Sequence, residues 1–223
     1  MGQMVKLKSN DGFEFGAYRA DPAGKPKGGV VIIQEIFGVN KHIKEVCDGY
    51  AKDGYIAIAP ALFDRVERDL ELGYSPEDQE KGKTTRAKLN WENSLADSQA
   101  AAQSIRDAAG KVAIIGYCFG GSVAWLGATR CNYDASVSYY GGNAADFANE
   151  KPKCPIICHI GTEDKGIGPD KVEKIKQGQP QVPVYLYEGA GHGFNCDHRG
   201  SYNEAAAKTA RSRTLDFLKQ HIG

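Results

Sequence analysis

The chain has 223 residues, within the range of one α/β domain, and its 41% hydrophobic and 25% charged content is that of an ordinary globular protein. Its 28 basic and 28 acidic residues cancel and form no basic block, which argues against nucleic acid or an anionic membrane as partner. No apolar run reaches the ~18 residues of a membrane span. The N-terminus lacks the apolar core of a signal peptide, so we expect a cytoplasmic protein.

The six cysteines form no C-x-x-C pair. Cys154 and Cys158 flank an apolar segment typical of a strand, and no pair of histidines lies at a spacing suited to zinc. Free cysteine often behaves as a small buried hydrophobe. We therefore expect buried thiols here, with no metal site and no disulfide framework.

The predicted elements begin with two short strands, 5–8 and 13–18, around the hairpin turn signal Asn10-Asp11-Gly12. Continuous β-branched and apolar runs at 29–33 and 55–59 are typical of strands buried on both faces. Between them, 41–53 has helical spacing. Residues 62–88 are polar and charged, which indicates an excursion over the surface. Further along we predict helices at 91–109, 120–129 and 201–221, and strands at 112–117, 135–140, 155–161 and 182–187.

Strands that alternate with helices favour a mostly parallel sheet covered on both faces. The N-terminal pair is the expected antiparallel exception. No linker, internal repeat or low-complexity tract interrupts the pattern. The sequence therefore predicts an α/β fold with about eight strands and a single domain over residues 1–223.

The most informative segment is GYCFGG at residues 116–121, which lies between an apolar strand and a helix-compatible run. Strand, Gly-x-nucleophile-x-Gly and helix form the nucleophile elbow, whose sharp turn exposes the central side chain. That residue is Cys118 here, where the commoner elbow has serine. The pattern predicts an enzyme that works through a thiolate.

Two further residues follow predicted strands at the same expected edge of the sheet. Asp164 lies in GTED after the strand 155–161, and His192 lies in GAGHGF after the strand 182–187. The order nucleophile, acid, histidine is that of the α/β-hydrolases. Glu163 and Asp170 compete with Asp164 for the role of the acid. The remaining histidines, His42, His159, His198 and His221, are interpreted as surface or packing residues.

The roles follow from the chemistry of these side chains. A thiol of ordinary pKa is only a few per cent ionised at neutral pH, so His192 is the expected base for Cys118. Asp164 would fix the imidazole tautomer and stabilise the imidazolium. The Phe119 amide and the Ile36 amide are the expected donors to the oxyanion. Glu35 directly follows a buried strand, and we expect it to be buried near the site.

At this point the chain resembles the dienelactone hydrolase (carboxymethylenebutenolidase) family. The resemblance rests on QEIFG at 34–38, GYCFGG at 116–121, GTED at 161–164 and GHGF at 191–194. It implies an α/β-hydrolase fold, a Cys-His-Asp triad without metal or organic cofactor, and a small ester or lactone substrate. It also implies that Glu35 pairs with Cys118 in the resting enzyme and takes part in its activation.

One departure concerns the arginines that grip the substrate carboxylate in this family. Four residues after the histidine, where one arginine is expected, the chain has Cys196. A thiol cannot reproduce a bidentate arginine–carboxylate contact. The candidate substrate-binding residues are therefore Tyr140, Arg86 and Arg199, with Lys81 and Lys83 as alternatives to Arg86.

Two other functions stay open at the level of sequence. Another cysteine-elbow enzyme, of amidotransferase or DJ-1 type, is one; amidotransferases have His-x-Glu late in the chain, whereas Phe194 stands two residues after His192. A redox sensor or binding protein on a hydrolase scaffold is the other, since an exposed thiolate is oxidisable. Because no coiled coil or obvious interface is present, we expect a monomer.

Overall fold

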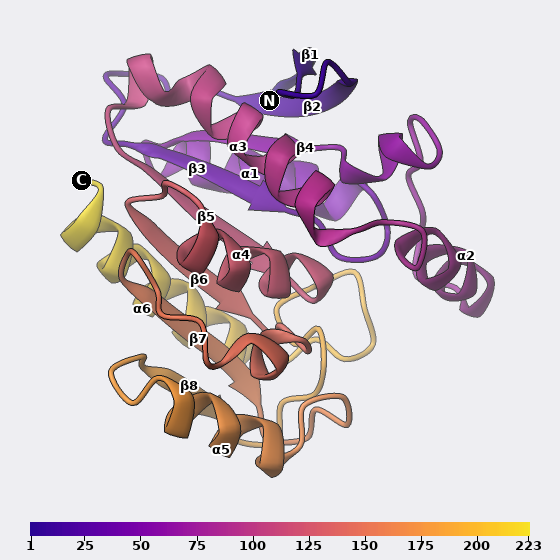
Figure 1. The fold of residues 1–223 in the computed structure, drawn as a ribbon, viewed down its shortest axis with the longest axis vertical. Coiled ribbons are helices and arrows are strands. Elements are labelled where there is room, and N and C mark those ends of the chain that lie inside the picture. The colour runs from indigo at the N-terminus through magenta and orange to yellow at the C-terminus, as the bar shows by residue number, and fades with distance from the viewer. The chain divides into compact units, whose positions relative to one another are not determined.

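The computed structural model describes all 223 residues. Its contacts divide the chain into two compact units (Figure 1). The first comprises residues 1–113 with Ile222, and the second comprises residues 114–221 with Gly223. None of the helices combines the length and the apolar character that crossing a membrane requires.

The first unit holds four neighbouring strands in the order β1-β2-β4-β3. β1 (Gln3–Lys8) and β2 (Glu14–Ala20) form the predicted antiparallel hairpin. β2 is also antiparallel to β4 (Ile56–Pro60), whereas β3 (Gly29–Ile33) runs parallel to β4. Every residue of β3 and β4 is buried, as their continuous apolar sequences predict.

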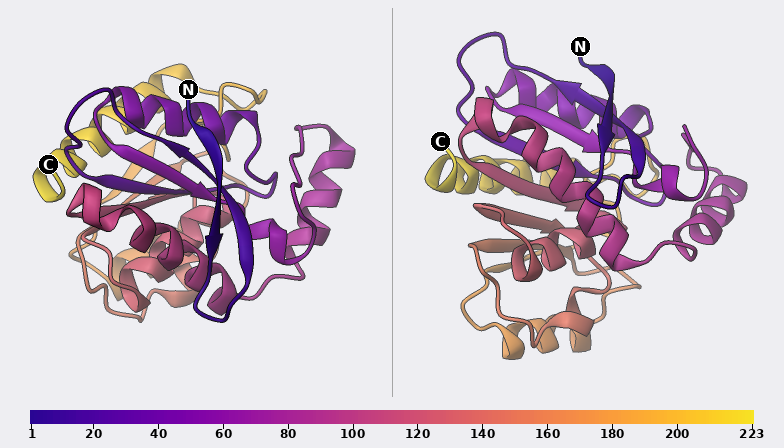
Figure 2. Two further views of the ribbon diagram at one scale, coloured as in Figure 1. Left: turned by 90° about the horizontal axis from the view of Figure 1, so that it is seen from above. Right: turned by 45° about the horizontal axis from the view of Figure 1, so that its top comes forward.

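Two long helices pack on β3 and β4 in this unit. α1 (Lys41–Lys52) begins after Asn40, whose side chain accepts a hydrogen bond from the Ile43 amide. α3 (Trp91–Ala109) begins in the same way after Asn90. Figures 1 and 2 show the two helices on opposite faces of the strands. The first unit is therefore a sheet covered on both sides.

The predicted excursion over residues 62–88 contains regular structure. A 3₁₀ turn, η1 (Leu62–Arg65), is followed by the helix α2 (Pro76–Arg86). Ser75 and Asp78 form a reciprocal capping box at its start, and Pro76 occupies a first-turn position. Only Gly82 and Thr85 of α2 are buried, which explains why the sequence shows no core pattern there.

The second unit contains the strands β5 to β8, in that spatial order. They are β5 (Val112–Tyr117, its first two residues in the first unit), β6 (Ala135–Tyr139), β7 (Ile156–Gly161) and β8 (Val184–Tyr187). β6, β7 and β8 are parallel to one another. Figure 1 shows α4 (Phe119–Arg130) and α6 (Glu204–His221) on opposite faces of these strands.

The predicted mostly parallel α/β fold with about eight strands and helices on both faces is confirmed. Outside the excursion over residues 62–88, two short elements were not predicted. They are the 3₁₀ turn η2 (Ala144–Phe147) and the helix α5 (Pro169–Gly178). α5 buries only Val172 and Ile175, so its sequence contains too few apolar residues to show a helical period.

Candidate active site

The structure places Cys118 on a sharp turn between β5 and α4. Its backbone has φ 57° and ψ −114°, a left-handed conformation that costs a non-glycine residue about 1–3 kcal/mol. A Cβ atom on Gly116 would lie 1.8 Å from the Gly120 carbonyl oxygen, and one on Gly121 would lie 2.3 Å from the Tyr139 carbonyl oxygen. The glycines of the motif are therefore required by close backbone approach, as a nucleophile elbow demands.

The turn presents Cys118 at the amino end of a helix. Phe119 is the first residue of α4, and its amide belongs to the first turn, where helical N–H groups have no partner within the helix. The positive end of the helix dipole favours negative charge at this point. This environment suits both a thiolate and the oxyanion of a tetrahedral intermediate.

Asp164 and His192 are brought together at the ends of two adjacent strands. The Nδ1 atom of His192 lies 2.7 Å from Oδ2 of Asp164. The other carboxylate oxygen of Asp164 accepts a hydrogen bond of 2.8 Å from the Gly166 amide. Asp164 is buried, whereas the competing acids Glu163 and Asp170 are exposed. Geometry therefore selects Asp164 as the partner of His192.

Backbone hydrogen bonds hold the two loops beside each other. The Thr162 amide donates to the Tyr187 carbonyl at 3.0 Å, and the Glu163 amide donates to the Ala190 carbonyl at 2.9 Å. These bonds continue the parallel pairing of β7 and β8 beyond the ends of the strands. They fix the distance between the residues that precede Asp164 and those that precede His192.

The surroundings of His192 favour its protonated form. Burial lowers the pKa of its imidazole, but the charge of Cys118 and hydrogen bonds to Asp164 and Cys118 together raise that pKa to about 10. The ring thus contacts the thiol on one side and the carboxylate on the other. Such an arrangement stabilises the imidazolium form of His192.

Glu35 and Ile36 belong to the first unit, directly after β3. Glu35 is buried, as predicted, and the Tyr74 hydroxyl donates to its Oε2 atom at 3.4 Å. Asn40 in turn donates to the Tyr74 hydroxyl at 3.2 Å. No motif signals this contact, because Tyr74 lies in the charged segment before α2.

Two of the candidate substrate-binding residues lie beside His192. The Tyr140 ring has its centroid 5.2 Å from that of His192, and its backbone has the unusual φ of 39°. The Arg199 guanidinium lies against Gly193, where a Cβ atom would be 2.5 Å from Nη1. Cys196 is fully buried, so its thiol is not available to a substrate.

Arg86 contacts residues that lie close to it in the sequence. Its guanidinium lies 4.4 Å from the centre of the Trp91 ring and donates to the Leu89 carbonyl at 3.2 Å. Lys83 pairs with Glu80, and Lys81 pairs with Glu67. The Arg86 contacts link the end of α2 to the start of α3.

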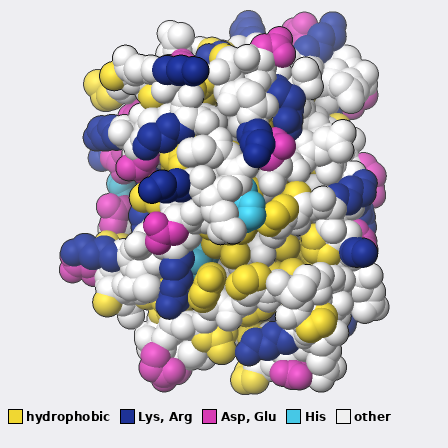
Figure 3. Space-filling view, turned by 90° about the vertical axis from the view of Figure 1, so that its left-hand side faces the viewer, with side chains coloured by type: hydrophobic (Ala, Val, Ile, Leu, Met, Phe, Trp, Pro, Cys, Tyr) yellow, Lys and Arg dark blue, Asp and Glu magenta, His cyan; other side chains and the backbone are white.

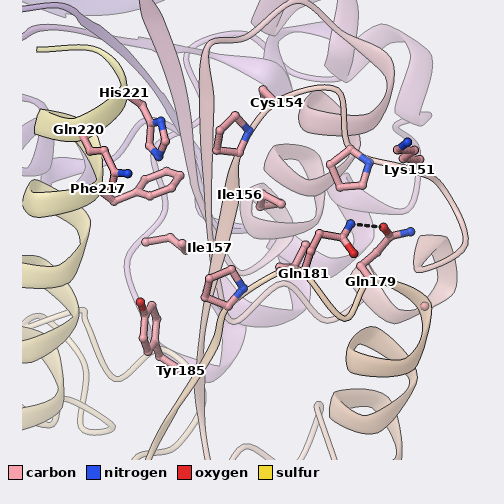
Figure 4. A pocket seen from close by; sticks show the side chains of 15 residues that line it. Lys151, Cys154, Ile156, Ile157, Gln179, Gln181, Tyr185, Phe217, Gln220 and His221 are labelled. Carbon is pink, nitrogen blue, oxygen red and sulfur yellow. Dashed lines mark hydrogen bonds between the residues drawn. The ribbon is translucent and has the colours of Figure 1, made fainter.

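A separate cavity of about 820 Å³ lies at the amino ends of β7 and β8. Figure 4 shows Ile157, Tyr185 and Phe217 on the side of α6, and Ile156 with Gln181 on the opposite side. Hydrophobic side chains gather in the lower half of the face in Figure 3, which views the molecule from the side where these strands begin. Asp164 and His192 follow the carboxyl ends of the same strands, so this cavity includes none of the predicted site residues.

The chain is similar to known proteins along nearly its whole length. Residues 15–222 match the model of the dienelactone hydrolase family. The chain is 36% identical to a proposed carboxymethylenebutenolidase of Synechocystis, over 96% of this chain and 94% of that protein. It is 34% identical to the carboxymethylenebutenolidase of Pseudomonas putida, with the same coverage of both chains.

Solved structures agree with this assignment. A proposed dienelactone hydrolase from Klebsiella pneumoniae superposes with a TM-score of 0.86 at 30% identity, covering 99% of this chain and all of that one. The dienelactone hydrolase-like promiscuous phosphotriesterase P91 from metagenomic libraries, at 23% identity and a TM-score of 0.77, has the same fold. The elbow, the strand order and these matches agree: the chain has the α/β-hydrolase fold, belongs to the dienelactone hydrolase family, and is an ester- or lactone-hydrolysing enzyme.

Proposed function

We propose that this enzyme hydrolyses a small carboxylic ester or lactone through Cys118, His192 and Asp164, with an acyl-thioester intermediate. The observation that supports this best is the continuous contact from thiol to imidazole to buried carboxylate, in which His192 bonds to both Cys118 and Asp164. The match of one family model to residues 15–222 further supports a single hydrolase domain over the chain.

In the first half of the reaction, the Cys118 thiolate attacks the acyl carbon and the carbonyl electrons move to oxygen. The Phe119 amide, at the start of α4, and the Ile36 amide donate to this oxyanion, each worth about 2.7–4 kcal/mol in related chemistry. The carbon–oxygen bond to the leaving group breaks as the oxyanion collapses. His192 gives its proton to the departing alkoxide, which leaves as an alcohol or stays tethered in an opened lactone.

In the second half, a water molecule attacks the thioester while His192 accepts its proton. The carbon–sulfur bond breaks, the thiolate returns, and the carboxylic acid product is released. Asp164 keeps the imidazole oriented through its 2.7 Å bond and stabilises the imidazolium in both halves. Ester and water are thereby converted into acid and alcohol with no other reactant.

We assign to Glu35 the control of the reactivity of the Cys118 thiol. A buried carboxylate can accept a hydrogen bond from a thiol that lies beside it. The family resemblance gives Glu35 this role towards Cys118 in the resting enzyme. We expect Glu35→Gln to change both the acylation rate and the rate at which iodoacetamide alkylates Cys118. A Glu35→Gln enzyme that matches the native one in both rates would remove this part of the proposal.

The substrate is recognised by Tyr140 and Arg199 in this proposal, because both lie on or against the His192 loop. The buried Cys196 leaves the family's second carboxylate-binding position without a charge. Dienelactone is therefore one candidate among small esters and lactones.

The direct test is p-nitrophenyl acetate hydrolysis combined with mass spectrometry of the acylated protein. Cys118→Ala is expected to lose activity and the acyl adduct. Cys154→Ser, which replaces a half-buried thiol two residues before β7, is expected to keep both. Full activity in Cys118→Ala would refute the proposed nucleophile.

A further inference from the structure

A chain of hydrogen-bonded side chains, buried except for the half-buried Arg213, crosses the strands of the second unit and includes Tyr187 at the end of β8. His159, on β7, is fully buried and uses both ring nitrogens: Nδ1 lies 2.8 Å from the Tyr187 hydroxyl and Nε2 lies 3.1 Å from the Thr214 hydroxyl. The Thr214 hydroxyl lies 2.6 Å from that of Tyr139. Arg213 donates from Nη1 to the Tyr187 hydroxyl at 3.2 Å. The chain joins β6, β7, β8 and α6.

Arg213 determines which atoms donate and which accept in this chain of hydrogen bonds. A guanidinium can only donate, so the oxygen of Tyr187 accepts from Arg213, and the only acceptor left for the Tyr187 proton is Nδ1 of His159. Burial and the nearby Arg213 charge lower the pKa of His159 to about 3, so the ring is neutral. With Nδ1 as acceptor, Nε2 carries the ring proton and donates it to the Thr214 hydroxyl, which shares a further hydrogen bond with the Tyr139 hydroxyl.

The positions of His159 and Tyr187 connect this chain of hydrogen bonds to Asp164 and His192. His159 stands five residues before Asp164, and Tyr187 stands five residues before His192. Their side chains are therefore hydrogen-bonded to each other near the ends of β7 and β8, shortly before the loops that carry Asp164 and His192. The pairing of β7 and β8 ends at Gly161 and Tyr187, so the side-chain bond reinforces the strands where the ladder stops.

Aromatic packing continues from this chain to the catalytic ring. Phe194, two residues after His192 and fully buried, has its ring 5.0 Å from that of Tyr187. It also lies 5.4 Å from Tyr140, whose ring is 5.2 Å from His192. A shift of Tyr187 or His159 would therefore reach His192 through contacts on the same loop.

We propose that the Arg213–Tyr187–His159–Thr214 chain positions the His192–Asp164 pair, and that Tyr187 and Thr214 are positioning residues for the reaction. The inference rests on the proposed roles of His192 and Asp164. It extends the machinery to α6, where neither the motifs nor the family resemblance places a functional residue.

The structure offers matched controls for two hydroxyl groups. Tyr187→Phe removes a hydroxyl from the chain, whereas Tyr185→Phe removes one from the same strand that has no place in it. Thr214→Val removes the hydroxyl and keeps the shape, whereas Thr214→Ser keeps the hydroxyl. The four purified enzymes are compared with the native one for kcat, KM and the pH dependence of kcat/KM, together with the pKa of His192 from ¹⁵N NMR.

We expect Tyr187→Phe and Thr214→Val to lower kcat by about 10-fold with KM nearly unchanged, because small misplacements of reacting groups are costly. The His192 pKa and the alkaline limb of kcat/KM should move to lower pH, since a misaligned Asp164 stabilises the imidazolium less. Tyr185→Phe and Thr214→Ser should stay within twofold of the native enzyme, which is about the scatter of such assays.

The inference fails if Tyr187→Phe and Thr214→Val match their controls in kcat, in the alkaline limb and in the His192 pKa. If Tyr187→Phe does not fold, the two Thr214 variants decide the question, because they leave every aromatic ring in place. Failure of the proposed function has a different signature, which is activity retained in Cys118→Ala. The His192 pKa is measured without turnover, so it reports on positioning in either case.

Discussion

Two histidines of the second unit, His192 in the loop after β8 and His159 within β7, show how differently one residue type can be used. Burial lowers the pKa of both rings. The pKa of His192 nevertheless rises to about 10, because its partners are the sulfur of Cys118 and the carboxylate of Asp164. The pKa of His159 falls to about 3, because its partners are hydroxyl groups and its nearest charge is the cation of Arg213.

The difference shows that the charge of the partners, and not the depth of burial, decides whether the pKa of a buried histidine rises or falls. His192 can exist as an imidazolium, as the proton transfers of the proposed mechanism require. His159 stays neutral and serves as a fixed donor and acceptor between strands and helix. The following predictions test this contrast, in order of decreasing effect.

The largest effect is expected from Asp164→Asn, which removes the anion that distinguishes His192 from His159. The asparagine can favour the wrong imidazole tautomer, and such a change lowers kcat by about 10⁴ in a serine triad. We expect a loss of about 10³–10⁴ in kcat/KM with p-nitrophenyl acetate as substrate. A loss below 10-fold would mean that His192 does not depend on its carboxylate partner. Glu163→Gln, in the same loop but exposed, is the control.

The second prediction concerns the alkaline limb of the native pH–rate profile. Because the folded pKa of His192 lies above the ordinary value, the stabilisation of its charged form is complete below about pH 6.5 and disappears as pH rises through about 10. kcat/KM should therefore fall on the alkaline side near that pKa. In Asp164→Asn the limb should move to lower pH. A limb at the same pH in both enzymes would assign it to another group.

The third prediction uses His159, for which the sign is opposite. Its pKa is about 3 in the folded state and near 6.5 in the unfolded chain, so the unfolded chain binds one more proton between these values. The native protein should lose up to about 1.4 kcal/mol of unfolding free energy per pH unit from this group as pH falls through that window.

The test is urea unfolding between pH 4 and pH 7 of the native protein and of His159→Gln. The variant should be less stable at pH 7, and its stability should fall with a shallower slope, by about one proton per molecule. Equal slopes would show that His159 is protonated in the folded state. His198→Gln, an exposed histidine, is the control.

The smallest effect is expected from Arg213→Met. Burial is the main cause of the low pKa of His159, and the charge of Arg213 is the minor one. Removing that charge should raise the His159 pKa modestly, to a value still well below 6.5, as seen by ¹⁵N NMR. A rise to the ordinary value would make Arg213, and not burial, the main cause. Arg211→Met on the same helix controls for the loss of a surface cation.

Much of the candidate site was predictable because its signals lie in short stretches of neighbouring residues. The elbow at Cys118 needs glycines at fixed offsets, and Asp164 and His192 each follow an apolar run that reads as a strand. Those signals depend only on neighbouring residues. The same holds for the hairpin β1–β2 and for the long helices α1 and α3.

The missing parts depend on contacts between distant residues. His159 is a single polar residue in an apolar strand, and its partners Tyr187 and Thr214 lie 28 and 55 residues away. Tyr74 reaches Glu35 from 39 residues along the chain. α5 and α2 bury too few residues to show a helical period.

The left-handed backbone of Cys118 has a consequence for how this sequence can evolve. Glycine adopts that conformation without strain, so Cys118→Gly should fold at least as stably as the native protein while losing its thiol. Selection for stability alone would accept that replacement. A cysteine that persists at this position through many generations is therefore a record of selection for activity, and a stability screen of random variants should enrich the inactive glycine form.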